Sequence, residues 1–311
     1  MRPVFFTLHL GSSEIGLRSY GLLIAAGLAV AIVMGAREAR RRGMDVGRVL
    51  DFAFWAVVVG LVASRITYGL VNAGTFARAC LGTDAYSGPR ALPAVLWDCT
   101  RILHVWEGGL VFYGGILGGG LVALAFARRE GWSLGALGDV FAPGMAAGHA
   151  LGRLGCLAAG CCFGKESGSW GLSFPKSSVA FDELASFGAL PPGATATPPL
   201  HPTQLYEAIG EALICLALLA LRPRLRARPG ALILTYLALY GALRFTVELF
   251  RGDVARRFIV ELATPRLSAL LGVPGAEPLL LSVGQVASLL LLAGCGVALA
   301  RRRRIGARPN A

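Results

Sequence analysis

The sequence predicts an all-α integral membrane protein with seven transmembrane helices, and three observations support this prediction. Of the 311 residues, 55% are hydrophobic and 15% are charged, whereas a soluble domain carries about a quarter charged residues. The mean hydropathy is +0.62. Seven apolar runs approach the ~20 residues that a helix needs to cross the hydrocarbon core. This composition excludes disordered chains, fibrous repeats and disulfide-rich secreted scaffolds.

The seven predicted spans are uninterrupted by clusters of charged residues, and glycine, which allows helices to approach closely, is frequent in them. They cover residues 19–36, 49–72, 109–127, 135–160, 203–221, 231–250 and 279–300.

The arginines predict the orientation of these spans. They cluster after the first, third, fifth and seventh spans, as the positive-inside rule requires for cytoplasmic segments. These arginines are Arg37, Arg40, Arg41, Arg42, Arg48, Arg128, Arg129, Arg222, Arg224, Arg226, Arg228, Arg301 to Arg304 and Arg308. We therefore expect a periplasmic N-terminus, a cytoplasmic C-terminus and one membrane domain over 1–311, with residues 163–202 as a small periplasmic head.

The excess of 30 basic over 18 acidic residues is explained by topology and by contacts with anionic lipid. No nucleic-acid partner is expected.

Several polar side chains fall inside the predicted spans, where an ionised group costs several kcal/mol unless it is paired or faces water. Arg153 and Arg244 are predicted at the outer depth of spans four and six, where two planar guanidinium groups are suited to clamping a phosphate. Glu248 follows Arg244 by four residues, so the two share a helix face. Arg65 is equally consistent with a structural ion pair, for example with Asp139. The whole set is Tyr20, Arg65, Asp139, His149, Arg153, Glu207, Glu211, Arg244 and Glu248.

Glycines surround Tyr113 at the start of the third span. Gly118 to Gly120 are typical of tight helix packing. Gly114 and Gly115 are candidates for a close approach of a lipid headgroup to the backbone.

Taken in order, seven short motifs resemble those of the prolipoprotein diacylglyceryl transferase family of the bacterial inner membrane. Each is weak alone, but together they cover about residues 20–251. They are Tyr20-Gly21, Arg65 to Tyr68, Trp106 to Gly115, Asp139 to Pro143, Gly152 to Gly155, His201 to Glu207 and Tyr240 to Glu248.

The resemblance implies seven transmembrane helices and transfer of the diacylglyceryl group of phosphatidylglycerol to the lipobox cysteine of a prolipoprotein signal peptide, releasing glycerol 1-phosphate. It implies no cofactor, and no cluster of residues has convincing metal-ligand spacing. The active site would face the outer leaflet of the inner membrane.

Residue roles follow from the same resemblance. Arg153 corresponds to the arginine that binds phosphatidylglycerol, and Arg244 to a second essential arginine with Glu248 as its partner. Tyr240 and His201 would lie near the reacting thiol, and Tyr20 at the lipid site. A thiolate nucleophile needs a proton acceptor, and His201, Tyr113 assisted by Arg244, and Glu248 are all candidates.

The sequence departs from the family pattern at two places. Tyr113 stands where well-studied members carry histidine, although its hydroxyl can both donate and accept. In the segment from Gly152 to Gly164, Cys156 replaces an asparagine and Cys161 replaces a glutamate, while Gly164 keeps its place. These three positions are expected to line the headgroup site.

The remaining cysteines have different expected roles. Cys80 and Cys99 lie in the first outer segment and can pair with each other. Cys215 and Cys295 are expected as buried small apolar residues.

Three functions other than the transferase are alternatives. A membrane thiol–quinone oxidoreductase would use Cys156, Cys161 and Cys162, but they lack the C-x-x-C spacing of redox motifs, and the arginines would be unexplained. An inactive lipid-binding paralogue is the third hypothesis. Transport is weaker, because no inverted repeat is evident.

Overall fold

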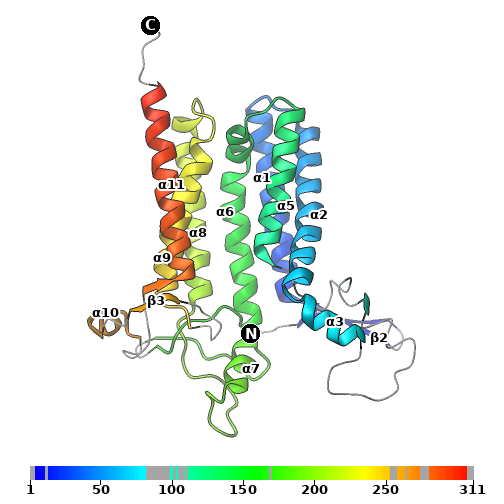
Figure 1. Cartoon of the computed structure of the whole chain (residues 1–311), viewed down its shortest axis with the longest axis vertical. Coiled ribbons are helices and arrows are strands. Elements are labelled where there is room, and N and C mark those ends of the chain that lie inside the picture. The colour runs from blue at the N-terminus through cyan, green and yellow to red at the C-terminus, as the bar shows by residue number, and fades with distance from the viewer. Residues whose placement is uncertain are drawn as a thin grey trace. The chain divides into compact units, whose positions relative to one another are not determined.

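The computed structural model describes residues 4–10, 13–81, 99–100, 103, 109, 111–167, 170–252, 258–262, 265–273 and 280–306. This part of the chain is mostly helical (Figure 1). A long helix lies at each of the predicted apolar runs, with ends shifted by a few residues. These helices are α1 (Ser19–Arg41), α2 (Val46–Val71), α5 (Phe112–Arg129), α6 (Leu134–Ala159), α8 (Thr203–Leu225), α9 (Ala231–Glu248) and α11 (Val283–Gly306).

Five of these helices, α1, α2, α8, α9 and α11, are long and apolar enough to cross a membrane. The prediction of a helical membrane protein is therefore confirmed. Helices α5 and α6 are not among the five, since α5 has 18 residues with many glycines and α6 carries Asp139, His149 and Arg153.

Shorter elements connect the long helices. The chain begins with a hairpin of β1 (Val4–Leu10) and β2 (Ser13–Arg18), which pair antiparallel with Thr7 opposite Gly16. β3 (Phe258–Leu262) and β4 (Leu280–Ser282) form a second antiparallel pair. Neither pair was expected from the sequence. The other short helices are α3 (Ala73–Leu81), α7 (Val179–Ser186) and α10 (Pro265–Leu271).

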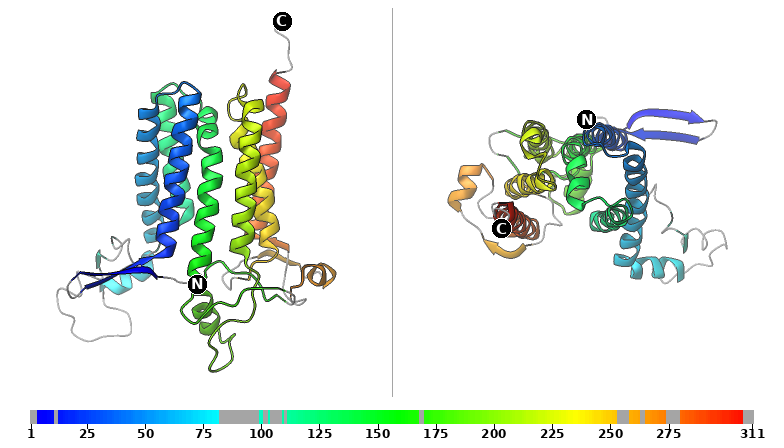
Figure 2. Two further views of the ribbon diagram at one scale, coloured as in Figure 1. Left: turned by 180° about the vertical axis from the view of Figure 1, so that it is seen from behind. Right: turned by 90° about the horizontal axis from the view of Figure 1, so that it is seen from above.

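The chain divides into two compact units, residues 1–38 with 138–311, and residues 39–137. In the first unit, α1 packs closely on α6, because a Cβ on Gly27 would lie 2.6 Å from the carbonyl oxygen of Gly148. On its other side α6 meets α8 and α9 in a buried apolar core that includes Ala146, Leu218 and Tyr236. Both views in Figure 2 show α8, α9 and α11 side by side.

The second unit is built on the pair α2 and α5. Gly114 faces the backbone of α2, and a Cβ there would overlap the Thr67 hydroxyl and lie 2.6 Å from the carbonyl oxygen of Ala63. Arg65 is buried and donates from Nη1 to the carbonyl oxygen of Gly109 at 2.9 Å. This packing accounts for Gly114 without a ligand.

Two of the cysteine expectations are confirmed. Cys80 and Cys99 form a disulfide, and Cys215 and Cys295 are buried free cysteines.

The predicted head segment, 163–202, has a small hydrophobic core of its own. Phe163, Phe174, Ala180 and Leu200 are all almost fully buried in it. The Ser178 hydroxyl caps α7 by accepting from the Phe181 N–H. The segment is therefore an ordered structure rather than a plain connector.

Candidate active site

A buried ionic network lies between α6, α8 and α9, within the first unit. The Arg153 Nη2 lies 2.9 Å from Glu207 Oε1, and the Arg244 Nη1 lies 3.3 Å from Glu207 Oε2. The Arg244 Nη2 also pairs with Glu248 Oε2 at 2.7 Å, and Ser282 donates to the other oxygen of Glu248 at 3.1 Å. The structure thus brings Arg153, Arg244 and Glu248 together, and one carboxylate bridges the two arginines.

His149 extends this network along α6. Arg153 Nε donates to His149 Nε2 at 3.2 Å, and His149 Nδ1 lies 2.8 Å from Glu211 Oε1. Because Nε2 accepts, the hydrogen bonds assign the proton to Nδ1, which donates to Glu211. The imidazole also lies against the Tyr240 ring, with centroids 5.5 Å apart, which places Tyr240 beside the ionic network as expected.

The carboxylates are the most deeply buried members of the network. Glu207 is 1% exposed and Glu211 is fully buried. Removing one partner from a buried ion pair costs about 3–5 kcal/mol, because the other charge is left uncompensated. The guanidinium groups are therefore held at fixed positions by the glutamates.

Sequence reasoning noted Glu207 and Glu211 as polar span residues but did not place them in the site. Their spacing could have indicated a site. Glu207 and Glu211 lie four residues apart in α8, as His149 and Arg153 do in the facing helix α6. Each pair presents two polar groups on one helix face. His149 was missed in the same way.

His201 lies apart from the arginine network in the contacts of the described residues. Its Nδ1 lies 3.0 Å from the Tyr206 hydroxyl, and its ring packs on Phe250 at 5.1 Å between centroids. Burial lowers the pKa of His201, so the imidazole is neutral at pH 7. The structure thus places His201 in an aromatic cluster rather than beside Arg244.

Tyr20 and the glycine motif fall in different units. Tyr20 opens α1 against the last turns of α6, where a Cβ on Gly155 would lie 3.3 Å from the Tyr20 carbonyl oxygen. Tyr113, Gly114 and Gly115 belong to the second unit, where the Tyr113 side chain is 67% exposed.

Gly164 lies where three chain segments cross. Its N–H donates to the carbonyl oxygen of His201 at 2.9 Å, and the next N–H, of Lys165, donates to the carbonyl oxygen of Phe250 at 2.8 Å. A Cβ on Gly164 would lie 2.5 Å from the His201 oxygen and 2.7 Å from the Phe250 oxygen. Gly164 is therefore required by the backbone crossing itself.

We expect Gly164→Ala to lower the free energy of unfolding by about 1–3 kcal/mol, as overpacking does. Thermal unfolding in detergent measures this, with Gly294→Ala in α11 as the control, because a Cβ on Gly294 meets nothing within 4 Å. An equal loss of stability in both variants would contradict the crowding argument.

Three cysteines gather at the end of α6. The sulfur atoms of Cys156, Cys161 and Cys162 all lie within 4.8 Å of one another. Hydrogen bonds from the Cys156 and Cys161 thiols, with help from the charges of Arg251 and Arg153, lower the pKa of Cys162. The sequence spacing suggested no ligand cluster, and the fold creates one.

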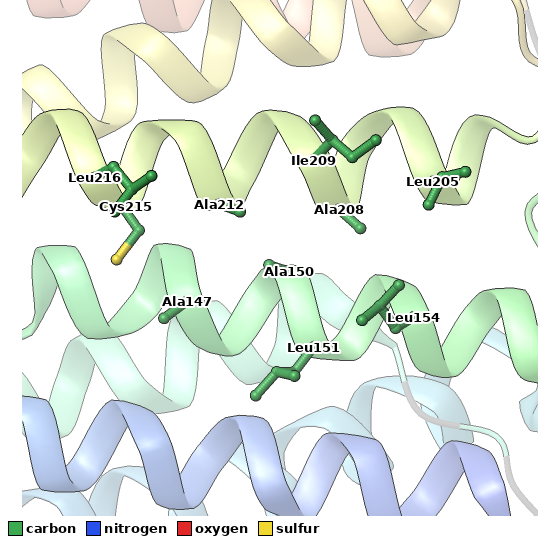
Figure 3. A pocket seen from close by; sticks show the side chains of 10 residues that line it. All are labelled: Ala147, Ala150, Leu151, Leu154, Leu205, Ala208, Ile209, Ala212, Cys215 and Leu216. Atoms are coloured by element: carbon green, nitrogen blue, oxygen red, sulfur yellow. The ribbon is translucent and has the colours of Figure 1, made fainter.

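An apolar cavity of about 500 Å³, largely open to the outside, runs between α6 and α8, and its lining residues Ile209 and Leu216 are exposed. Side chains of the two helices face one another across it, with Leu154 and Leu205 at one end and Ala147 and Cys215 at the other (Figure 3). Leu154 follows Arg153 directly in α6. Ala208 likewise follows Glu207 in α8, so the cavity and the ionic network occupy the same stretch of the two helices, although no residue of the network lines the cavity. A polar and an apolar region on one pair of helices suit an amphipathic ligand with an anionic head.

These features define a multi-pass membrane protein whose helices enclose an arginine–glutamate site next to an apolar cavity. The family model of prolipoprotein diacylglyceryl transferase matches residues 3–301, and the chain belongs to this family.

Relatives with the name phosphatidylglycerol–prolipoprotein diacylglyceryl transferase are similar to this chain in sequence. The Rhodococcus jostii protein is 36% identical over 250 residues, covering 78% of this chain and 63% of the relative. The Mycobacteroides abscessus protein is 32% identical over 253 residues, covering 80% and 68%. The Clostridium tetani protein is 27% identical over 254 residues, covering 81% and 86%. The chain thus spans less than two thirds of the length of the Rhodococcus relative.

Proposed function

We propose that this chain transfers the diacylglyceryl group of phosphatidylglycerol to the lipobox cysteine thiol of prolipoproteins and releases glycerol 1-phosphate. The observation that carries the proposal is the joining of Arg153 and Arg244, from different helices, through Glu207 beside an apolar cavity. Family membership agrees with it, and the names of the relatives supply the two substrates.

The reaction explains why two arginines are needed. The thiolate sulfur gives an electron pair to the glycerol carbon, the bond from this carbon to the phosphate oxygen breaks, and the phosphate leaves with the electron pair. Negative charge therefore grows on the leaving phosphate. Guanidinium groups that are already held in place stabilise this charge without reorganisation, and Glu207 and Glu248 hold them.

The residues of this site would have the following roles. The proposed reacting end includes Arg244, Glu248 and Tyr240. His201, in its aromatic cluster, and Tyr113, in the second unit, are candidates for proton transfer from the family resemblance alone. The proposed lipid-binding residues of the first unit are Arg153, Tyr20, Gly164, Cys156 and Cys161. Gly114 and Gly115, in the second unit, are proposed from the family resemblance alone. Within this set, the roles of Arg153, Arg244 and Glu248 have the most direct support, because ion pairs link Arg153 to Glu207 and Arg244 to Glu248.

The cavity between α6 and α8 would hold an acyl chain of the lipid. We expect Ala212→Phe, which fills the cavity, to reduce transfer from dioleoyl phosphatidylglycerol about tenfold and to reduce transfer from a dihexanoyl lipid much less. Ala212 lines the cavity, whereas Ala220 lies on the same helix, is exposed and does not line it. Rates with both lipids for Ala212→Phe and the control Ala220→Phe measure this, and equal effects of the two variants would contradict the placement. A tenfold reduction corresponds to about 1.4 kcal/mol of lost binding free energy, which is the free energy of burying one or two methylene groups.

The proposed topology has seven spans in the bacterial inner membrane, with a periplasmic N-terminus and a cytoplasmic C-terminus. Basic residues in the last turns of α1, α5 and α8 support it, as does the Cys80–Cys99 disulfide beyond α2, which belongs in an oxidising compartment. In this topology residues 1–311 are one membrane domain, 163–202 are its periplasmic head, and the ionic network faces the outer leaflet.

The purified chain in detergent, supplied with phosphatidylglycerol and a lipobox peptide, tests the function. We expect the peptide to gain the mass of one diacylglyceryl group on its cysteine and an equal amount of glycerol 1-phosphate to appear. Lipid binding without product would instead indicate an inactive lipid-binding protein, and cysteine-dependent reduction of a quinone would indicate an oxidoreductase. Either result would overturn the proposal.

A further inference from the structure

The cysteine cluster at the end of α6 is not explained by the network of arginines and glutamates. Cys156 lies in the last turn of the helix, and Cys161 and Cys162 follow in the next loop. All three are half-buried free thiols whose sulfurs lie within 4.8 Å of one another. A tetrahedral zinc ion with Zn–S bonds of about 2.3 Å holds its sulfurs about 3.8 Å apart. The cluster is thus close to the spacing that one ion requires.

The loop that carries the sulfurs is held in an unusual conformation. Cys162 has a φ of 59°, in the left-handed region that a side chain rarely adopts. The Thr203 hydroxyl donates to the Cys162 carbonyl oxygen at 2.7 Å, and Gln204 Nε2 donates to the Cys161 carbonyl oxygen at 2.7 Å. Strained backbone that the surroundings fix in this way is typical of functional sites.

The charges near the cluster suit an anionic metal site. Three thiolates and one Zn²⁺ carry a net charge of about −1. Arg153 precedes Cys156 by three residues and lies on the same face of α6. The thiol cluster and the proposed phosphate site therefore share Arg153.

We propose that Cys156, Cys161 and Cys162 bind one zinc ion as thiolates, and that the fourth coordination position is open for the thiol of the incoming lipobox cysteine. Zinc sites with three protein ligands and an open position are typical of catalysis rather than of structure. A thiol that coordinates zinc is deprotonated, which removes the need for a histidine at the position of Tyr113. This inference rests on the proposed transferase function for the identity of the incoming thiol, and it gives Cys156 and Cys161 the role of zinc ligands in place of a direct contact with the headgroup.

The proposed step balances as follows. The lipobox thiol displaces a water from the zinc and releases its proton to the water at the membrane surface. The sulfur then forms its bond to the glycerol carbon, and the bond between this carbon and the phosphate oxygen breaks. Glycerol 1-phosphate leaves with the electron pair on its oxygen, and the neutral thioether dissociates from the zinc. No oxidant or reductant is needed.

Metal analysis of the purified full chain tests the site without relying on activity. After incubation with Zn²⁺ and removal of unbound metal, we expect about one zinc per chain and at least a tenfold lower content in Cys156→Ser and Cys161→Ser. Cys295→Ala is the matched control, since Cys295 is a buried cysteine of α11, and it should keep the wild-type content. Size-exclusion profiles show whether each variant is folded.

Cobalt supplies the second readout. Co²⁺ in the wild-type protein should give a thiolate-to-cobalt charge-transfer band and the intense visible bands of a tetrahedral site, both absent from Cys161→Ser. A lipobox peptide should shift these bands, and the same peptide with serine in place of cysteine should not.

The outcomes separate this inference from the proposed function. Zinc bound through the three cysteines without any transfer would leave the metal site standing and overturn the transferase. Transfer by a chain that binds no zinc, or a mass spectrum showing a disulfide within the cluster of the active protein, would overturn the zinc site and leave the transferase standing. If the protein binds zinc but the visible bands of the cobalt-loaded protein do not shift when the cysteine peptide is added, the fourth coordination position is not open to the thiol and that part of the inference is wrong.

Discussion

Arg153→Lys is expected to reduce the rate of diacylglyceryl transfer about 100-fold, although the positive charge is kept. Lysine is a point charge, whereas the guanidinium group reaches Glu207 through Nη2 and His149 through Nε at the same time. Losing one preorganised donor to a developing oxyanion costs about 10²–10³ in rate. Initial rates with phosphatidylglycerol and a lipobox peptide measure this.

Arg222→Lys is the matched control. Arg222 is also an arginine paired with a glutamate, Glu38, at 3.4 Å, but it lies in the last turn of α8, away from Glu207 near its start. We expect its rate to stay within about twofold of the wild type, since lysine keeps the positive charge opposite Glu38 and Arg222 takes no part in the network around Glu207. A similar loss in both variants would mean that Arg153 only supports the fold.

Glu207→Gln is expected to have the largest combined effect on stability and activity. The carboxylate bridges Arg153 and Arg244 and is 1% exposed. Glutamine has nearly the same shape but no charge, so two guanidinium groups lose their shared counter-ion. We expect the free energy of unfolding to fall by about 3 kcal/mol and transfer to fall more than 100-fold because the arginines are no longer held.

Unfolding and transfer must be measured on the same preparation of Glu207→Gln. Glu166→Gln is the control, because Glu166 is an exposed residue of the 163–202 segment. If Glu207→Gln were fully active and as stable as the wild type, Glu207 would not organise the arginines.

Part of this site was predictable from the sequence. Arg153 and Arg244 stand out because ionised groups in apolar spans require a partner, and the spacing of Arg244 and Glu248 gives their pairing. The bridge through Glu207 was not predictable, because it depends on how α6, α8 and α9 are rotated relative to one another. That rotation is set by packing of side chains far apart in the sequence.

The same distinction holds for the fold. Apolar runs predicted all seven long helices within a few residues, since length and hydropathy are local properties. The hairpin of β1 and β2 was missed because it lies in a short mixed segment. The thiol cluster was missed because the positive φ angles of Gly160 and Cys162 turn the chain back on α6, and no spacing rule encodes such a turn.

The affinity for phosphatidylglycerol relative to diacylglycerol, which lacks the phosphate, tests the central claim that Arg153 and Arg244 bind one phosphate. Both dissociation constants are measured by titration of the purified chain in detergent, for the wild type, Arg153→Gln, Arg244→Gln and the control Arg222→Gln. We expect the ratio of the dissociation constant for diacylglycerol to that for phosphatidylglycerol to be the same in the wild type and the control. In each site variant this ratio should be at least tenfold smaller, which corresponds to about 1.4 kcal/mol. A site variant that keeps the wild-type preference would show that its arginine does not touch the phosphate, and the shared phosphate site would be wrong.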